Sequence, residues 1–234
     1  MHPLTYLHFQ LQLEGMIVED HRLMKDGQAP GPEPVKQSPW LVLARLTTQE
    51  LVAYYDESLE AGLRKKLEAR LDKIQFPHVE PLLEVLNAHG RKAQAEHFVT
   101  YVFPPYSANA ADRMVLRYRK QDPRVQAFGF DGLGEHVFGI EQDGRVVSAC
   151  VSSRENELCA EAWVQTAPEH RRQGLAGKVV RAWAKSLMDT GKIPFYSHAA
   201  GNQESAGLAT KLGLQAIFEE INLSAVETSD TPVL

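Results

Sequence analysis

The feature that most constrains this chain is a run of polar and small residues from Ala167 to Lys178, with the sequence APEHRRQGLAGK. It follows a strand-like stretch (residues 158–166) and leads into a helix-like one (residues 175–190), in which apolar residues recur with helical periodicity. The first turn of a helix carries main-chain N–H groups without partners, and the helix dipole adds partial positive charge there. Because Gly174 has no Cβ, a ligand can approach the main chain closely. The run therefore predicts an anion site for a phosphate or pyrophosphate.

Two common phosphate loops do not fit this run. A P-loop fails because Arg172 stands where the first glycine belongs and Val179 replaces the hydroxyl that holds magnesium. A dinucleotide-binding fingerprint fails because Ala176 replaces its second glycine. The pattern that fits is R/Q-x-x-G-x-G/A, with Arg171, Gly174 and Ala176 at the defining positions. This resembles the acetyl-CoA loop of the GNAT superfamily of N-acetyltransferases.

A second stretch strengthens the resemblance. Asn202 to Leu214, NQESAGLATKLGL, is similar to the pattern N-x-x-[AS]-x-x-[LVA]-x-x-K-L-G-[FL] that closes GNAT domains. The resemblance covers about residues 110–224 and implies an α/β (α+β) fold, with a mixed, mostly antiparallel sheet flanked by helices. The strands expected here cover residues 113–118, 136–140, 145–152, 158–166, 194–198 and 215–223, and the helices cover residues 122–128, 175–190 and 203–212.

The N-terminal part carries no comparable motif. Residues 1–104 are expected to form a smaller α/β accessory domain, and residues 105–234 the acetyltransferase domain. Residues 4–24 alternate only weakly between apolar and polar. The elements expected after them are a hairpin of residues 40–46 and 50–55, a helix from Asp56 or Ser58 with leucines at every fourth position, a helix over residues 79–88, and a strand over residues 97–103.

Charge and cysteine content exclude several classes of protein. The net charge of −5 argues against a nucleic-acid or anionic-membrane partner, either of which favours a basic surface. We expect no secretory signal and no membrane span, and two cysteines, Cys150 and Cys159, suit a reducing cytoplasm. The nine histidines show no zinc-like spacing, so we expect no metal. A homodimer remains open.

The resemblance implies direct transfer of an acetyl group from acetyl-CoA (coenzyme A) to a primary amine, of a small molecule or a peptide, within a ternary complex. Main-chain groups of Val164, Gln165 and Thr166 would pair with the pantetheine arm as an added strand does. The pyrophosphate would lie against the amides of Arg171, Arg172, Gln173, Gly174, Leu175, Ala176 and Gly177. Asn202 and Ser205 would lie near the pantetheine or the thiol.

The catalytic residues depart from the family pattern. Many members carry a tyrosine seven positions after the asparagine as the acid for the departing thiolate, and here that position is Ala209. Tyr196 is the nearest phenol in the sequence, although an aromatic side chain there also suits packing. Glu161 is the candidate base, with a solvated strand residue as the alternative interpretation, and His198 is a second candidate that would act through water.

The missing tyrosine leaves two functional classes open. One is an acetyl-CoA-dependent N-acetyltransferase. The other is a non-catalytic module that binds or senses acyl-CoA, with the accessory domain used for sensing or assembly. We favour the enzyme because relatives without that tyrosine can be active.

Overall fold

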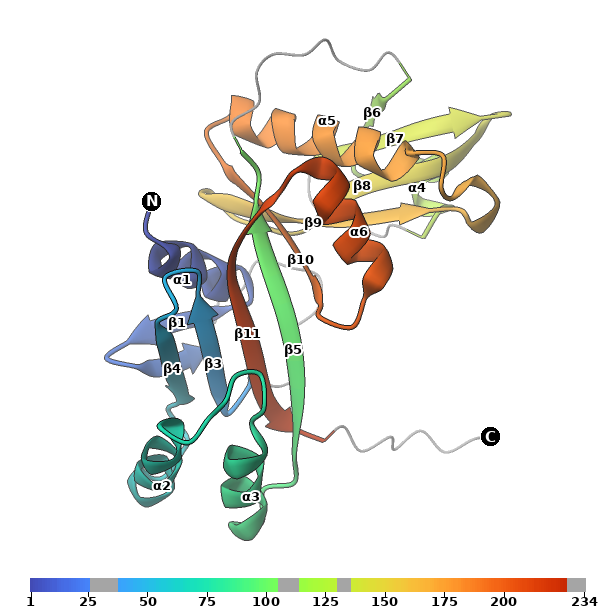
Figure 1. Ribbon diagram of the computed structural model, residues 1–234. Helices are drawn as coiled ribbons and strands as arrows, with labels where there is room; N and C mark the ends of the chain where they lie inside the picture. The colour runs from blue at the N-terminus through green and yellow to red at the C-terminus, as the bar shows by residue number, and fades with distance from the viewer. Residues whose placement is uncertain (26–37, 105–113, 130–135, 227–234) are drawn as a thin grey trace.

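The computed structural model describes residues 1–25, 38–104, 114–129 and 136–226, and these residues form one mixed, mostly antiparallel sheet flanked by helices (Figure 1). The strands are β1 (Met16–Glu19), β2 (Arg22–Lys25), β3 (Leu41–Leu46), β4 (Leu51–Asp56), β5 (Ala93–Val102), β6 (Leu116–Tyr118), β7 (Val137–Gln142), β8 (Arg145–Glu155), β9 (Cys159–Thr166), β10 (Ile193–Ala199) and β11 (Gln215–Ala225). The helices are α1 (Pro3–Leu13), α2 (Ala61–Leu71), α3 (Glu80–Ala88), α4 (Pro123–Gln126), α5 (Leu175–Asp189) and α6 (Gln203–Leu212), with a 3₁₀ turn, η1, at Pro168–His170. The strand order is β1-β2-β4-β3-β11-β5-β10-β9-β8-β7-β6.

The predicted strand, loop and helix around Gly174 are confirmed. β9 ends at Thr166, and α5 starts at Leu175 directly after Gly174. The apolar stripe of α5 is buried against the sheet, with Trp183 fully buried at its centre. This stripe is why the helix crosses back over the strands and returns the chain as β10, parallel to β9.

β9 and β10 pair only at the start of each strand and then separate. β10 pairs with β9 at Ile193, Pro194 and Phe195, opposite Cys159, Ala160 and Glu161. From Phe195 to Ala199, β10 instead pairs on its other side with β5, antiparallel, over the register Phe195↔Val102 to Ala199↔Phe98. Beyond Glu161, the edge of β9 that faces away from β8 therefore has no strand partner among the described residues.

One strand of the N-terminal part lies within the C-terminal part of the sheet. The strand predicted over residues 97–103 is the end of β5, which pairs with β10 on one side and β11 on the other. β5 precedes the domain boundary predicted after residue 104, whereas its partner strands β10 and β11 follow that boundary. The division into two domains stays a prediction, and the sheet passes from one part to the other through β5 and β11.

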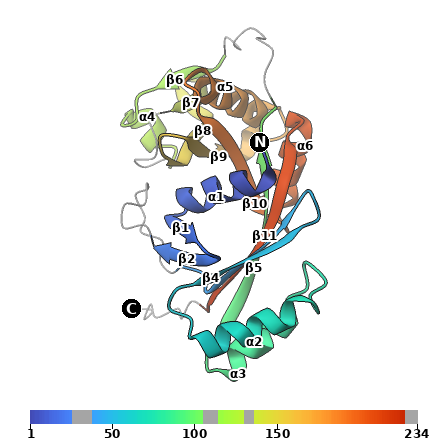
Figure 2. The same ribbon diagram turned by 90° about the vertical axis from the view of Figure 1, so that its left-hand side faces the viewer.

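Helices cover the sheet on both faces. The first helix, α1, has no clear signal in the weak alternation of residues 4–24, yet it packs on one face against β9 and β11 (Figure 2). On the other face, α5 and α6 pack over β8 to β10, and α2 and α3 cover the far end of β3, β4 and β11 (Figure 1). None of the helices in the described part of the chain combines the length and apolar character needed to cross a bilayer.

Candidate active site

The loop before α5 presents a row of unpaired main-chain donors. Arg172 and Gly174 both have left-handed backbone conformations, with φ of 62° and 77°, and they turn the chain into the helix. Among the described residues, no acceptor is found for the N–H groups of residues 172–177. Free N–H groups at the positive end of a fifteen-residue helix are suited to a phosphate or pyrophosphate. The anion site stays a prediction, and the unpaired N–H groups of this loop are compatible with it.

The free edge of β9 leads into this loop through the short turn η1. The N–H group of Ala167 donates to a β8 carbonyl at 2.9 Å, which sets the alternation of the antiparallel ladder. By that alternation Gln165 directs its main-chain groups toward β8, whereas Val164 and Thr166 direct theirs toward the open side. Arg171 supports this assignment, because its Nε donates to the Thr166 carbonyl oxygen at 3.3 Å. Val164 and Thr166 are therefore the positions whose main-chain groups point to the open side, where the Thr166 carbonyl oxygen already accepts from Arg171.

The start of α6 lies beside Tyr196 of β10. Asn202 caps the helix, since its Oδ1 accepts the Ser205 N–H at 3.0 Å. The Tyr196 hydroxyl donates to the Ser205 carbonyl oxygen at 3.4 Å. Ser205 and Ala209 are four residues apart on α6 and share a face of the helix. The phenol of Tyr196 therefore reaches the side of α6 on which the family's usual tyrosine position, Ala209, is buried.

The three candidate catalytic side chains lie on opposite faces of the sheet. Tyr196 and His198 are on the face covered by α5 and α6. Glu161 is on the α1 face, where Ser197, the residue between the other two, donates its hydroxyl to a Glu161 carboxylate oxygen. The structure brings Tyr196 and His198 together, with ring centroids 6.3 Å apart, and separates both from Glu161 by the thickness of the sheet.

His198 forms a pair with Tyr101 of β5, a residue that sequence reasoning did not single out. The rings stack with centroids 5.5 Å apart. Nδ1 of His198 lies 2.9 Å from the Ala199 carbonyl oxygen, so Nδ1 carries the proton, and the Tyr101 hydroxyl donates to Nε2 at 3.3 Å. The only available signal was the strand prediction for residues 97–103, which does not reveal a partner strand.

Tyr196 is buried, and this sets its protonation state. Burial raises the pKa of its phenol above the ordinary value of 10.0. The hydroxyl therefore keeps its proton at neutral pH and is available as a donor. This arrangement suits an acid rather than a base.

Glu161 is 8% exposed, so the alternative of a solvated strand residue is wrong. Its Oε2 lies 3.2 Å from Nη1 of Arg154, on the neighbouring strand β8. The same nitrogen lies 3.5 Å from Oε1 of Glu14, at the end of α1. A guanidinium thus bridges two carboxylates on the α1 face. Arg154 and Glu14 were both missed by sequence reasoning, because neither belongs to a motif.

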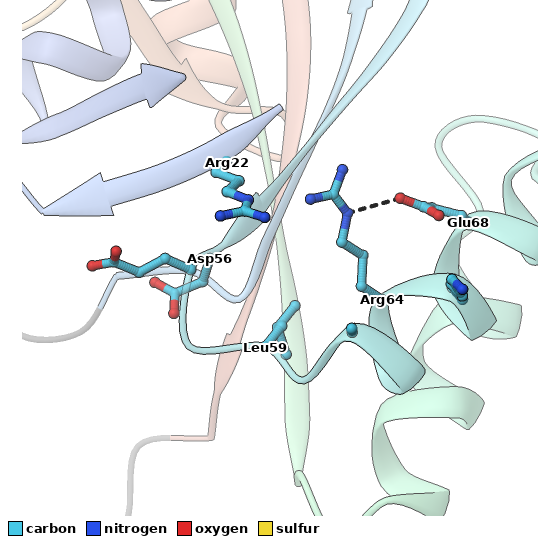
Figure 3. A pocket seen from close by; sticks show the side chains of 8 residues that line it. Arg22, Asp56, Leu59, Arg64 and Glu68 are labelled. Carbon is cyan, nitrogen blue, oxygen red and sulfur yellow. Dashed lines mark hydrogen bonds and ion pairs between the residues drawn. The ribbon is translucent and has the colours of Figure 1, made fainter. Parts of the chain in front are cut away.

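A separate surface hollow of about 380 Å³ lies where β4 leads into α2, away from β9 and β10 (Figure 3). Arg64 on its wall donates to Glu68 at 2.8 Å. Its charged lining is balanced, with three basic and three acidic side chains: Arg22, Arg64, Lys65, Asp56, Glu57 and Glu68. Because these charges balance, the lining has no net charge that would select a charged ligand, and we assign this hollow no function.

A helix start with unpaired N–H groups, after a strand edge that opens beside a parallel neighbour, is the arrangement expected of an acyl-coenzyme-A-dependent transferase. A family model described as GNAT acetyltransferase matches residues 57–219, and the chain belongs to this family, whose members use acetyl-CoA as the acyl donor. The match begins well before residue 110, where the predicted resemblance started.

Several solved structures are similar. A GNAT-family acetyltransferase from Novosphingobium aromaticivorans has 20% identity and a TM-score of 0.49, over 58% of this chain and 66% of that one. An acetyltransferase of the family from Colwellia psychrerythraea has 14% identity and a TM-score of 0.49, over 96% of each chain. A related protein from Streptococcus suis has 15% identity and a TM-score of 0.44, over 63% of this chain and 69% of that one. No curated protein matches the sequence at a significant level.

The titration of Glu14 yields a first prediction. Burial raises its pKa from the ordinary 4.5 to about 7, Glu161 adds to the rise, and Arg154 opposes it. Because the folded state holds this proton more tightly than the unfolded chain, the stabilisation is complete below pH 4.5 and is lost as the pH rises through about 7. Glu14→Gln removes the titrating carboxyl group, and with it this loss of stability at high pH. We expect urea unfolding to show parent and variant alike near pH 5, and the variant more stable near pH 8 by on the order of 2 kcal/mol.

The control for this measurement is Glu68→Gln, which removes a carboxylate from an exposed pair on α2. We expect its effect to be small at both pH values. A stability difference between parent and Glu14→Gln that is the same at both pH values would contradict the prediction.

Proposed function

We propose that this protein is an N-acetyltransferase that moves the acetyl group of acetyl-CoA to a primary amine, by direct attack within a ternary complex. One observation carries the proposal: the open edge of β9 is followed, after the short turn η1, by the unpaired N–H groups of residues 172–177. An extended arm and a diphosphate joined end to end fit a strand edge and a helix start that follow each other along the chain.

Different residues bind different parts of acetyl-CoA. Amides of Arg172 to Gly177 hold the pyrophosphate, and the side chains of Arg171 and Arg172, both exposed, add positive charge. Main-chain groups of Val164 and Thr166 pair with the pantetheine arm. Asn202 and Ser205 border the arm on the α6 side, where Asn202 also fixes the start of the helix.

When bound, acetyl-CoA supplies a thioester. Transfer breaks its carbon–sulfur bond and forms a carbon–nitrogen bond to the amine. Glu161 accepts the proton that the amine loses, and Arg154 together with Ser197 orients its carboxylate. Tyr196 donates a proton to the sulfur as it leaves, from the α6 side. His198 and Tyr101, next to Tyr196, form a proton path on that face. Base and acid thus act from opposite faces of the sheet, at the point where β9 and β10 separate.

The second candidate, a module that binds acyl-CoA without transfer, is favoured by Ala209 at the usual tyrosine position. Free thiol released from acetyl-CoA in the presence of an amine panel distinguishes the two. Stabilisation by acetyl-CoA with no thiol release from any amine would support the module.

Substituting Gly174 tests the anion loop. A methyl group at Gly174, in its left-handed conformation, blocks close approach of the pyrophosphate to the helix start. We expect Gly174→Ala to weaken acetyl-CoA binding at least tenfold in calorimetric titration.

Gly191 provides a matched control at the other end of α5. It has φ of 81° against 77° for Gly174, and an added Cβ meets nothing within 4 Å at either site. Both alanine variants therefore carry similar backbone strain, of about 1–2 kcal/mol. Equal loss of acetyl-CoA affinity in the two variants would show that strain, and not the loop, accounts for the effect.

Glu161→Gln tests the base. We expect kcat to fall by about 10²–10⁴-fold because the amide cannot take the proton, with the Kd of acetyl-CoA unchanged. The acidic limb of the pH–rate profile should also disappear. The control is Glu219→Gln on the opposite face of β11, where Glu219 pairs with Arg45 and His97. An unchanged pH profile in Glu161→Gln excludes it as the base.

Tyr196→Phe tests the acid. We expect kcat to fall by at least about tenfold with little change in the Kd of acetyl-CoA, since only the hydroxyl is lost. Tyr55→Phe is the control, because Tyr55 is a buried tyrosine on β4 whose hydroxyl has no partner among the described residues. If the two phenylalanine variants keep the same kcat, Tyr196 is a packing residue.

A further inference from the structure

A polar cluster lies beneath α1, on the face of the sheet that carries Glu161. We define it by five residues, and they come from four different elements: Gln10, Glu14, Arg154, Glu161 and Glu220. Glu220 on β11 interacts electrostatically with the other carboxylates and with Arg154. Gln10 donates its Nε2 to Glu14 at 3.3 Å. The cluster therefore joins the candidate base to two further carboxylates.

Strand register extends this polar layer across the middle of the sheet. Ser197 of β10 faces Thr100 of β5 directly, and side chains opposite each other in a ladder share a face. Because Ser197 contacts Glu161, Thr100 also lies on the α1 side. Next to this layer the same face is apolar, with Phe195 and Phe218 in the core under α1. The polar layer begins where β9 and β10 stop pairing.

Three acceptors in this layer have no partner among the described residues: Oε1 of Gln10, Oγ1 of Thr100 and Oε2 of Glu220. Their side chains belong to residues that are 1%, 0% and 2% exposed. Buried polar atoms without a partner are rare because each costs free energy. Here they surround a carboxylate cluster from two sides, from α1 and from the central strands.

The charges point to a cationic ligand. Three carboxylates share one guanidinium, that of Arg154, whose side chain is 41% exposed and marks the solvent side of the cluster. Burial raises the pKa of both Glu14 and Glu220, and a bound cation would draw both carboxyl groups into their charged form. The unpaired acceptors likewise call for a donor-rich group, and an ammonium group has three N–H donors and no acceptor. A metal ion fits less well, since no group of three or more acidic, histidine or cysteine side chains in the described residues is placed to hold one.

A reacting amine by itself does not explain the cluster. The amine must be neutral to attack, and several nearby carboxylates stabilise its charged form instead. One carboxylate, Glu161, is sufficient to take the proton. Glu14 and Glu220 are then available for a different positive group on the same molecule.

We propose, building on the acetyltransferase function above, that the acceptor is a primary amine with a second cationic group, held beneath α1 by Glu14 and Glu220. Gln10 and Thr100 supply the remaining acceptors for that group. Glu161 lies between it and the end of the β9–β10 pairing, so a short carbon chain spans from the held cation to the reacting nitrogen. One nitrogen of a diamine is thereby held as a cation, and the other accepts the acetyl group.

Three amines of matched length test the proposal: 1,4-diaminobutane, n-butylamine and 4-aminobutanoate. Thiol release at saturating acetyl-CoA gives kcat/KM for each. We expect the diamine to exceed butylamine at least tenfold and aminobutanoate to be the poorest acceptor. Glu220→Gln and Glu14→Gln should each lower the ratio of diamine to butylamine at least fivefold, whereas Glu219→Gln, on the other face, should leave it unchanged.

Calorimetric binding of 1,4-diaminobutane without acetyl-CoA provides a readout that does not depend on transfer. Binding that is lost in Glu220→Gln and Glu14→Gln but kept in Glu219→Gln supports the proposal even where no amine is acetylated. Transfer that is equal for diamine and butylamine overturns the proposal and leaves the acetyltransferase function intact. Absence of both acetyl-CoA binding and thiol release refutes the function, and absence of diamine binding together with no transfer refutes the inference.

Discussion

The site depends on the point at which β9 and β10 stop pairing. β10 changes partner there: its free side takes β5 from Phe195 onward, while β9 continues alone toward the helix start. A parallel pair that stayed closed would use the main-chain groups of Val164 and Thr166 internally. The separation leaves these groups without a strand partner, and the unpaired donors of the loop before α5 follow them along the chain. The place proposed for an extended donor therefore depends on main-chain geometry rather than on any single side chain.

The same separation explains why the candidate acid, Tyr196, and the candidate base, Glu161, lie apart. Side chains alternate across a strand, so neighbouring positions at the opening supply opposite faces. Tyr196 faces α6 and Ser197 faces α1, where it contacts Glu161. In the proposed function, an acceptor that enters from the α1 side would meet the Glu161 carboxyl group, while the sulfur on the other side would meet the phenol of Tyr196.

Local signals predicted much of this structure, because they act within a few residues. The helical stripe of α5 and the glycine before it predicted where the helix begins, and the closing motif predicted α6. Long-range partners were not predictable: nothing in residues 97–103 shows that β5 inserts between β10 and β11. The first helix was missed for a more specific reason. Its buried face includes Gln10, with Glu14 just beyond its end, and polar residues at buried positions weaken the apolar period by which helices are recognised.

The polar residues at buried positions of α1 are themselves informative. Replacing Gln10 and Glu14 by apolar residues of similar size would restore the period of α1, and such changes at Gln10 and Glu220 would remove unpaired acceptors. Packing alone therefore gives no reason for these three residues. A chain that keeps three carboxylates beneath a helix with one guanidinium among them sacrifices stability at that place. Such local conflicts are expected where a ligand completes the interactions. The cluster adjoins the candidate base and the opening of the sheet, so, on the proposed function, the ligand that completes it and the acetylated amine would be parts of one molecule.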